Sequence, residues 1–180
     1  MIIAIIPARG GSKRIPLKNI KKFNDKPMIA WAIHLAKKSK LFDYIFVSTD
    51  DKKIKKIAEK YGAIVPFIRP SNISGDKTPT VQVISHAVKE IDKSYQKVDY
   101  ACCIYPCSPF ILVSDLVRSF NLLKLSKENF VYPVTEYPHS IFRAMTRSKK
   151  GKMKFLHPKY EFTRTQDLKK TFHDSGQFYW

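Results

Sequence analysis

The sequence lacks the segments that mark membrane and repeat proteins. No apolar run approaches the roughly 20 residues that a membrane-spanning helix needs, and no basic region precedes an apolar one at the N-terminus. We therefore expect neither a membrane partner nor a signal peptide. Internal repeats and low-complexity segments are also missing. A chain of 180 residues, 44% of them hydrophobic, can bury a substantial core, so we expect a single domain over residues 1–180.

Cysteine is scarce, and its three positions exclude two kinds of site. Cys102, Cys103 and Cys107 lie close together but lack CxxC spacing. Their odd number and this spacing argue against a disulfide framework and against a zinc site. The first two are expected on a buried strand, where they behave as small apolar residues. Free thiols predict a reducing, cytoplasmic setting.

Acidic residues are few, 15 against 33 lysines and arginines, which gives a net charge of +18. This imbalance permits a nucleic-acid binder, and it also suits an enzyme with anionic substrates. A binder of single strands would interleave aromatic and basic side chains on one face. Here much of the excess charge is lysine on an expected helix, residues 51–61, and such runs are usually solvated surface. We therefore expect no nucleic-acid partner.

The most informative stretch lies at residues 2–19. It begins with Ile2–Ile6, whose four β-branched isoleucines predict a buried strand, and Pro7 is expected to end that strand. The turn that follows, residues 8–14, has paired glycines that permit close backbone approach to a ligand. Successive N–H groups in such a turn form an anion site. Four cations accompany it: Arg9, Lys13, Arg14 and Lys18.

These features predict a site for a polyphosphate, although the usual phosphate motifs do not fit. The segment contains neither GxxxxGK followed by Ser or Thr, nor GxGxxG. The alternative interpretation is a surface hairpin with solvated charges.

The remaining chain alternates between expected strands and helices, which predicts an α/β fold with a mostly parallel sheet. Strands are expected at residues 43–49, 63–68, 98–105 and 129–135. Helices are expected at residues 27–40, 51–61, 81–91 and 114–125, and a hairpin at 143–155. In such sheets ligands bind outside the carboxyl ends of the strands. The turn at 8–14, Asp50-Asp51 and the segment after Ile68 should meet at that edge.

Four blocks of the sequence resemble one enzyme family. The block Ile6–Asn19, IPARGGSKRIPLKN, resembles the signature of the sugar-nucleotide cytidylyltransferases that activate nine-carbon acidic sugars, the CMP-sialic acid synthetase-like family. Three further blocks resemble the same family, namely VSTDD at Val47–Asp51, IRPSNISGD at Ile68–Asp76 and RTQDLKKTFHDSGQFYW at Arg164–Trp180. The resemblance implies a Rossmann-like, three-layer nucleotide-diphospho-sugar transferase fold.

The resemblance also implies a reaction. The last block is most similar to the members that act on pseudaminic acid, which implies CTP plus pseudaminic acid giving CMP-pseudaminic acid and pyrophosphate, with Mg²⁺ as cofactor. The alternatives are sialic or legionaminic acid as the sugar, or a nucleotide-binding remnant with little activity. Family members are commonly dimers, so a homodimer is expected.

Two departures from the family pattern affect these expectations. Relatives that act on sialic acid have a glutamine where this chain has Tyr105, which fits a different sugar acid. The family usually has an Asp-x-Asp pair downstream that binds the metal, and the sequence stops at Trp180 before that segment. We therefore expect the metal-binding segment to be missing and leave the metal ligands unassigned. Asp50 is open to three interpretations: a helix cap, a metal contact or a ribose contact.

The resemblance assigns three groups of site residues. The catalytic group, at the phosphates and the attacking hydroxyl, is Arg9, Lys13, Lys18 and Asn19. The nucleotide-binding group is Ala8, Gly10, Gly11, Ser12, Arg69, Ser74, Asp76, Thr78 and Thr80. The sugar-binding group is Tyr105, Arg143, Arg164, Gln166, His173, Asp174 and Gln177. The two threonines could instead serve as loop and helix caps. His173 with Asp174 could be a general base, or it could be a capping or interface pair.

Overall fold

The computed structural model describes residues 1–180. The chain forms two compact units, unit 1 (Met1–Pro133 with Gly176–Trp180) and unit 2 (Val134–Ser175). Unit 2 is thus an insertion, because the chain returns to unit 1 at its end. An insertion of this kind is compatible with one nucleotidyltransferase domain, so the expected single domain stays a prediction. No helix has the length and apolar character needed to cross a membrane.

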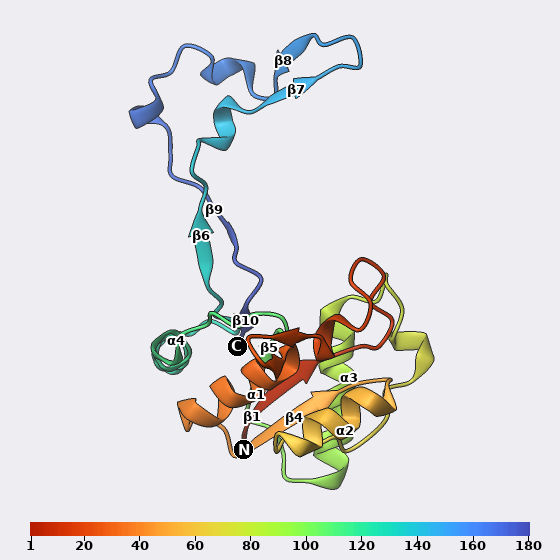
Figure 1. Cartoon of the computed structure of the whole chain (residues 1–180). Helices are drawn as coiled ribbons and strands as arrows, with labels where there is room; N and C mark the ends of the chain where they lie inside the picture. Colours follow the sequence, from red (N-terminus) through yellow and green to blue (C-terminus); the bar gives the residue numbers. More distant parts are fainter. The chain divides into compact units, whose positions relative to one another are not determined.

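A four-stranded sheet organises unit 1, in the order β10-β5-β1-β4 (Figure 1). Its strands are β1 (Ile2–Pro7), β4 (Tyr44–Ser48), β5 (Tyr100–Ile104) and β10 (Phe178–Tyr179). Strand β1 lies parallel to both β4 and β5, and only β10 is antiparallel. This confirms the mostly parallel α/β sheet. Pro7 is the last residue of β1, as expected, and the next N–H, that of Ala8, donates to the Ser48 carbonyl at 2.9 Å.

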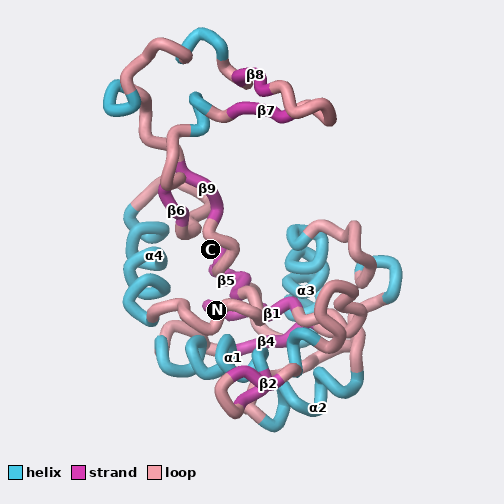
Figure 2. The backbone as a smooth tube through the Cα atoms, turned by 45° about the horizontal axis from the view of Figure 1, so that its top comes forward, coloured by secondary structure: helices cyan, strands magenta, loops and turns pink.

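Helices cover both faces of this sheet and make three layers (Figure 2). The helices are α1 (Met28–Ser39), α2 (Lys52–Lys60), α3 (Thr80–Ser94) and α4 (Val113–Leu125). On one face, α1, α2 and α4 bury apolar side chains such as Ile33, Ile54 and Leu116 in one core cluster. On the other face, Ala87 and Ile91 of α3 pack against β1 and β4. The four helices expected at residues 27–40, 51–61, 81–91 and 114–125 are therefore confirmed.

Two expected strands are wrong in extent. Residues 63–68 form only isolated bridges, Phe46 with Ile64 and Thr49 with Ile68. Pro66 lies between these bridges and has no N–H for a continuous ladder. The strand expected at 129–135 is reduced to β6 (Val134–Glu136), which pairs with β9 (Phe172–Asp174) in unit 2.

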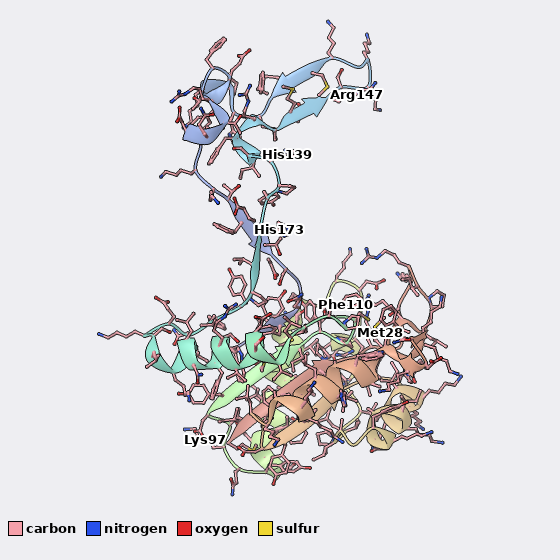
Figure 3. The ribbon with its side chains drawn as sticks, turned by 60° about the vertical axis from the view of Figure 1, so that its left-hand side comes forward. Met28, Lys97, Phe110, His139, Arg147 and His173 are labelled. Atoms are coloured by element: carbon pink, nitrogen blue, oxygen red, sulfur yellow. The ribbon has the colours of Figure 1, made fainter.

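Short elements complete unit 1. They are η1 (Lys18–Ile20), β2 (Lys22–Phe23), β3 (Lys26–Pro27) and η2 (Ser71–Ile73). The β2–β3 pair leads into α1 at Met28, which Figure 3 labels together with Phe110. Phe23 packs edge-on against the rings of Trp31 and Phe110, with centroids 6.4 and 5.8 Å away. These contacts fix the start of α1.

Unit 2 has strand pairs but no core of its own. Besides β6 and β9 it contains the expected hairpin, β7 (Met145–Arg147) with β8 (Met153–Phe155), and the short turns η3 (Ile141–Arg143), η4 (Pro158–Tyr160) and η5 (Thr165–Asp167). Gly151, with φ +81°, supplies the left-handed residue of the hairpin turn. None of its residues is buried. Its strands are therefore stabilised by backbone pairing with little apolar burial.

Candidate functional site

A cavity of about 450 Å³ lies in unit 1, where β1 and β5 end. Three segments line it: the turn after β1 with the following η1, the segment from Arg69 to Thr80, and the loop after β5. The lining residues are Pro7, Arg9, Ser12, Lys18, Asn19, Arg69, Ile73, Ser74, Gly75, Asp76, Thr78, Thr80, Val83, Tyr105, Pro106, Cys107, Ser108 and Gly176. The cavity is thus at the sheet edge that the parallel topology predicts.

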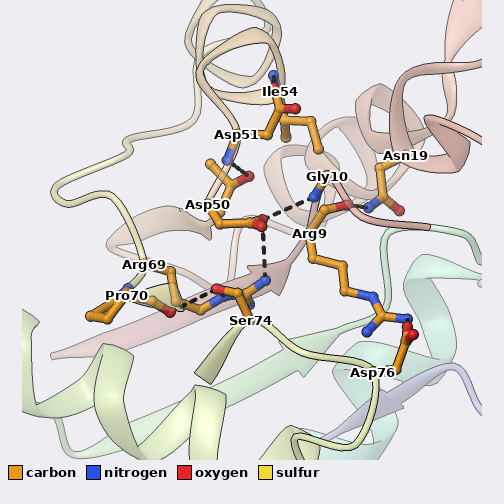
Figure 4. A network of polar contacts seen from close by, with 11 residues as sticks. Arg9, Gly10, Asn19, Asp50, Asp51, Ile54, Arg69, Pro70, Ser74 and Asp76 are labelled. Carbon is orange, nitrogen blue, oxygen red and sulfur yellow. Dashed lines mark hydrogen bonds and ion pairs between the residues drawn. The ribbon is translucent and has the colours of Figure 1, made fainter. Parts of the chain in front are cut away.

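The glycine turn is held by the two aspartates that follow β4. The Gly10 N–H donates to Asp50 Oδ1 at 2.9 Å (Figure 4). A Cβ at Gly10 would lie 2.7 Å from Asp51 Oδ2 and 2.8 Å from Asp51 Cβ, so only glycine fits there. At Gly11 a Cβ would meet nothing within 4 Å. The two adjacent glycines therefore have different roles, because Gly10 packs and Gly11 borders open space.

The turn also uses some of the N–H groups expected to cradle phosphate. The Ser12 N–H donates to the Gly10 carbonyl at 2.9 Å, and the Gly10 N–H is committed to Asp50. Of these three glycine and serine amides, only that of Gly11 has no acceptor within the protein. The phosphate cradle stays a prediction, with the Gly11 N–H as its open donor.

Two of the expected phosphate-binding cations share one carboxylate. Arg9 Nη2 lies 2.6 Å from Asp76 Oδ1, and Lys13 Nζ lies 2.5 Å from Asp76 Oδ2. The hydrogen bond from Lys13 and the charge of Arg9 hold the pKa of Asp76 below its ordinary value. The side chains of Arg9 and Asp76 are each about one-third exposed, whereas that of Lys13 is largely exposed. Asp76 is therefore ionised and engaged through both oxygens.

Arg69 is a buried, fixed cation beside the cavity, with only 4% of its surface exposed. Its Nε donates to Ser74 Oγ at 3.1 Å, and Ser74 in turn donates to the Pro70 carbonyl (Figure 4). Its Nη2 lies 3.7 Å from Asp50 Oδ1. Burial lowers the pKa of Arg69, and the charge of Asp50 opposes this shift. Asp50 therefore links the glycine turn to Arg69. The N-cap of α2 is Asp51, so the interpretation of Asp50 as a helix cap is wrong.

Asn19 is buried and its amide is held at both ends. Its Nδ2 donates to the Arg9 carbonyl at 2.8 Å, and its Oδ1 accepts from Cys107 Sγ at 3.3 Å. Burial raises the pKa of the Cys107 thiol, and the charge of Lys18 opposes this. Sequence reasoning did not place Cys107 or Ser108 in the site. The available signal was their position directly after β5, at the edge where β1 also ends.

Tyr105 and Thr80 meet across the cavity. Their hydroxyl oxygens are 3.1 Å apart, and the Tyr105 ring packs against Tyr179 with centroids 5.2 Å apart. Thr80 is the first residue of α3, whose N-cap, Pro79, offers no side-chain cap. The alternative that Thr80 caps a helix is therefore wrong at α3. The Gln177 carbonyl accepts the Tyr105 N–H at 2.9 Å, which joins two expected sugar residues through the backbone.

The other five expected sugar residues lie in unit 2, and His173 is labelled in Figure 3. Arg143 and Gln166 line a cavity of about 610 Å³ within this unit. Arg164 forms an ion pair with Asp167 at 2.8 Å, three residues along η5. The His173 ring nitrogen Nδ1 is 2.9 Å from the backbone carbonyl of Asp174.

Comparisons with known proteins agree on one family. Residues 3–178 match the sequence model of a family described as cytidylyltransferase. The chain is 37% identical over 177 residues to a pseudaminic acid cytidylyltransferase of Campylobacter jejuni (strain 81-176), an alignment that covers 98% of this chain and 76% of that protein. It is 37% identical over 130 residues to a CMP-N,N'-diacetyllegionaminic acid synthase of Legionella pneumophila, covering 72% of this chain and 56% of that protein.

A solved structure supports the same fold. The CMP:2-keto-3-deoxy-manno-octonic acid synthetase complexed with CTP superposes with a TM-score of 0.70 and covers 99% of this chain and 73% of its own. The sequence identity is 17%, so this similarity shows the fold alone. The three-layer nucleotidyltransferase architecture is thereby confirmed.

Proposed function

The chain belongs to the cytidylyltransferase family, and on this premise we propose that it activates pseudaminic acid by reaction with CTP. The observation that carries this proposal is the identity of 37%, across 98% of the chain, to a relative with that activity in its name. In the reaction a sugar hydroxyl attacks the α-phosphorus of CTP and loses its proton. The bond to the β-phosphate breaks, and the products are CMP-pseudaminic acid and pyrophosphate.

In this proposal the protein positions the substrates and stabilises charge, since nucleotidyl transfer asks for little covalent chemistry from side chains. Arg9, Lys18 and Arg69 are cations that line the cavity, and they suit a triphosphate. Asn19 is best suited to holding the Arg9 backbone, because its amide is already bonded at both ends. Ser74, Thr78 and Thr80 remain the candidates for ribose and base. Ala8 is fully buried and does not line the cavity.

For the sugar we propose a guanidinium partner, because arginine binds a carboxylate through two parallel hydrogen bonds. Arg164 is the first candidate and Arg143 the second. The ion pair of Arg164 with Asp167 is exposed on both sides, and exposed pairs are weak enough to exchange. Tyr105 lines the nucleotide cavity and is proposed to contact the sugar end of the substrates.

Mg²⁺ is proposed as an ion that accompanies the triphosphate. No group of three His, Cys, Asp or Glu side chains among residues 1–180 could hold a metal. Near the cavity, Asp50 and Asp76 are already paired with cationic side chains. These residues do not fit a preformed metal centre. Mg²⁺ commonly binds through one or two carboxylates and substrate phosphates, which is the form proposed.

The test is a pyrophosphate-release assay with CTP and Mg²⁺. One arm contains pseudaminic acid, a second contains sialic acid, and a third contains no sugar. In a second series CTP is replaced by UTP, ATP or GTP. We expect release with pseudaminic acid, little with sialic acid, and a preference for CTP. Faster turnover of sialic acid would support the alternative sugar, and equal turnover of four triphosphates would contradict the cytidylyltransferase assignment. Binding of CTP without turnover of any sugar would support the nucleotide-binding remnant.

A homodimer and a cytoplasmic setting are also part of the proposal. Unit 2 buries none of its residues and exposes large apolar side chains, which a second copy of the chain could cover. The three cysteines are free thiols, which suits a reducing compartment.

A further inference from the structure

We infer that Asp76 is a built-in competitor of the triphosphate, whose carboxylate occupies Arg9 and Lys13 while the phosphate site is empty. This inference rests on the proposed function, because it takes the triphosphate as the ligand of these cations. It gives Asp76 a role different from the ribose or base contact expected from the sequence.

Each carboxylate oxygen of Asp76 lies at ion-pair distance from one of the two cations proposed to bind phosphate. Asp76 Oδ1 is 2.6 Å from Arg9 Nη2, and Asp76 Oδ2 is 2.5 Å from Lys13 Nζ (Figure 4 shows the pair with Arg9). Asp76 and Arg9 line the same cavity. A ligand phosphate that binds Arg9 Nη2 and Lys13 Nζ would compete with the two carboxylate oxygens for the same donors.

The charges around the cavity explain why an acidic residue is useful there. Arg9, Lys18 and Arg69 line one cavity, and the charge of Arg9 lowers the pKa of Arg69. Like charges around one cavity repel one another, so the cations of an empty site would repel one another more strongly without Asp76. Asp76 supplies the opposite charge until a polyphosphate replaces it.

The position of Asp76 also allows its carboxylate to move away from Arg9 and Lys13. It follows Gly75 in a loop segment outside regular secondary structure, between η2 and α3. Its side chain is one-third exposed, so the carboxylate can be solvated when it releases the cations. With the triphosphate bound, the carboxylate would otherwise lie beside several phosphate charges of its own sign. After reaction the returning carboxylate would compete with pyrophosphate and favour its release.

The test compares the 180-residue chain with its Asp76→Asn variant by titration calorimetry without sugar. The probes are CTP and inorganic tripolyphosphate. We expect the variant to bind both probes about five- to tenfold more tightly, since the ion pairs of Asp76 with Arg9 and Lys13 no longer compete with the ligand. The difference should shrink at high salt, where exposed charges are screened. Inhibition by added pyrophosphate should also be stronger for the variant.

Glu59→Gln is the matched control, since it removes the same charge from an ion pair with Lys55 on α2. It should leave both affinities unchanged. Asp76→Ala must change the affinities in the same direction as Asp76→Asn, and thermal melting verifies that each variant is folded. Equal or weaker tripolyphosphate binding by the folded Asp76 variants would overturn the inference and assign Asp76 a supporting contact instead. If the unmodified chain binds tripolyphosphate but not CTP, the proposed function fails while the inference about Asp76 is still decided by the tripolyphosphate series.

Discussion

At the scale of single residues, the charged side chains around the cavity differ in the hydrogen bonds and ion pairs that they already make within the protein. Arg69 is tied to Ser74 and lies near Asp50, and Arg9 and Lys13 share Asp76. A polyphosphate can recruit a cationic side chain whose protein partner is partly open to solvent, because that partner can be hydrated when it is displaced. Arg9 meets this description and lines the cavity directly.

We predict that Arg9→Ala weakens CTP binding by on the order of 1.5–3 kcal/mol, the usual contribution of a hydrogen bond to a charged group. Titration calorimetry on the folded variant measures this change. The matched control is Arg118→Ala, which removes an exposed arginine paired with Asp115 on α4, remote from the cavity lining. An unchanged CTP affinity in Arg9→Ala would remove Arg9 from the site.

The two glycines of the turn provide a second prediction, for which each is the control of the other. Gly10→Ala should lower the free energy of unfolding by about 1–3 kcal/mol, the usual effect of overpacking, because its Cβ would clash with Asp51. Gly11→Ala should be neutral or slightly stabilising, since its Cβ meets open space and its φ is not positive. Denaturant unfolding measures both, and equal effects at the two positions would contradict the packing role of Gly10.

At the scale of secondary-structure elements, the sequence predicted what periodicity controls. The apolar run of β1, the helical spacing of α1 and α2 and the hairpin at β7–β8 are all confirmed, because each depends on local pattern. The segment at 63–68 was wrong because one proline outweighed its β-branched neighbours.

Part of the candidate site was also predictable from the sequence, and part was not. Arg9 and Ser12 of the glycine turn, Arg69 and the two threonines were found from their position at strand ends and from the family resemblance, and they line one cavity. The predicted residues Ala8, Gly10, Gly11 and Lys13 do not line it. The pairing of Asp76 with Arg9 and Lys13 was not predictable, since it depends on how a loop folds across residues distant in sequence. The short β10 strand, which closes the sheet from the end of the chain, carries too few residues for a periodicity signal.

The start of α2 carries a prediction of its own. Asp51 Oδ1 accepts from the Lys53 N–H at 2.6 Å and from the Ile54 N–H at 3.0 Å, which satisfies two donors at the helix start. Asp51→Ala should therefore lower the stability of the chain by about 1 kcal/mol. Asp51→Asn keeps an oxygen acceptor and should lose much less. Thermal unfolding compares the two variants, and an equal loss in both would show that the carboxylate charge, rather than the cap, is responsible.

At the scale of the whole molecule, the two units differ in how they are stabilised. Unit 1 contains two apolar core clusters around its sheet, whereas Val134–Ser175 contains no buried residue. The same unit carries ten lysines and arginines against four acidic residues, so it holds a share of the +18 net charge without a core to offset the repulsion. Local stability follows buried apolar contacts, so the two units should open with different free energies.

This difference predicts the pattern of amide hydrogen exchange. Amides of β1 and β5, which pair in the centre of the sheet, should exchange slowly at every protein concentration. Amides of Val134–Ser175 should exchange rapidly in dilute solution, because their short strand pairs contain no buried residue. If the proposed homodimer buries the exposed apolar surface of unit 2, their protection should rise with protein concentration by mass action. Slow exchange of unit 2 in dilute solution would contradict the first expectation.

Two single substitutions separate dimer formation from general stability in this experiment. Phe162 in unit 2 and Leu125 on α4 are 94% and 88% exposed, so replacing either with serine should leave the fold of one chain intact. Phe162→Ser should reduce the concentration-dependent protection of unit 2, whereas Leu125→Ser should not. Light scattering across the same concentrations gives the molecular mass directly. A constant monomer mass, with unit 2 exchanging rapidly throughout, would remove the homodimer from the proposal and leave the cavity of unit 1 as the part of the chain that binds CTP.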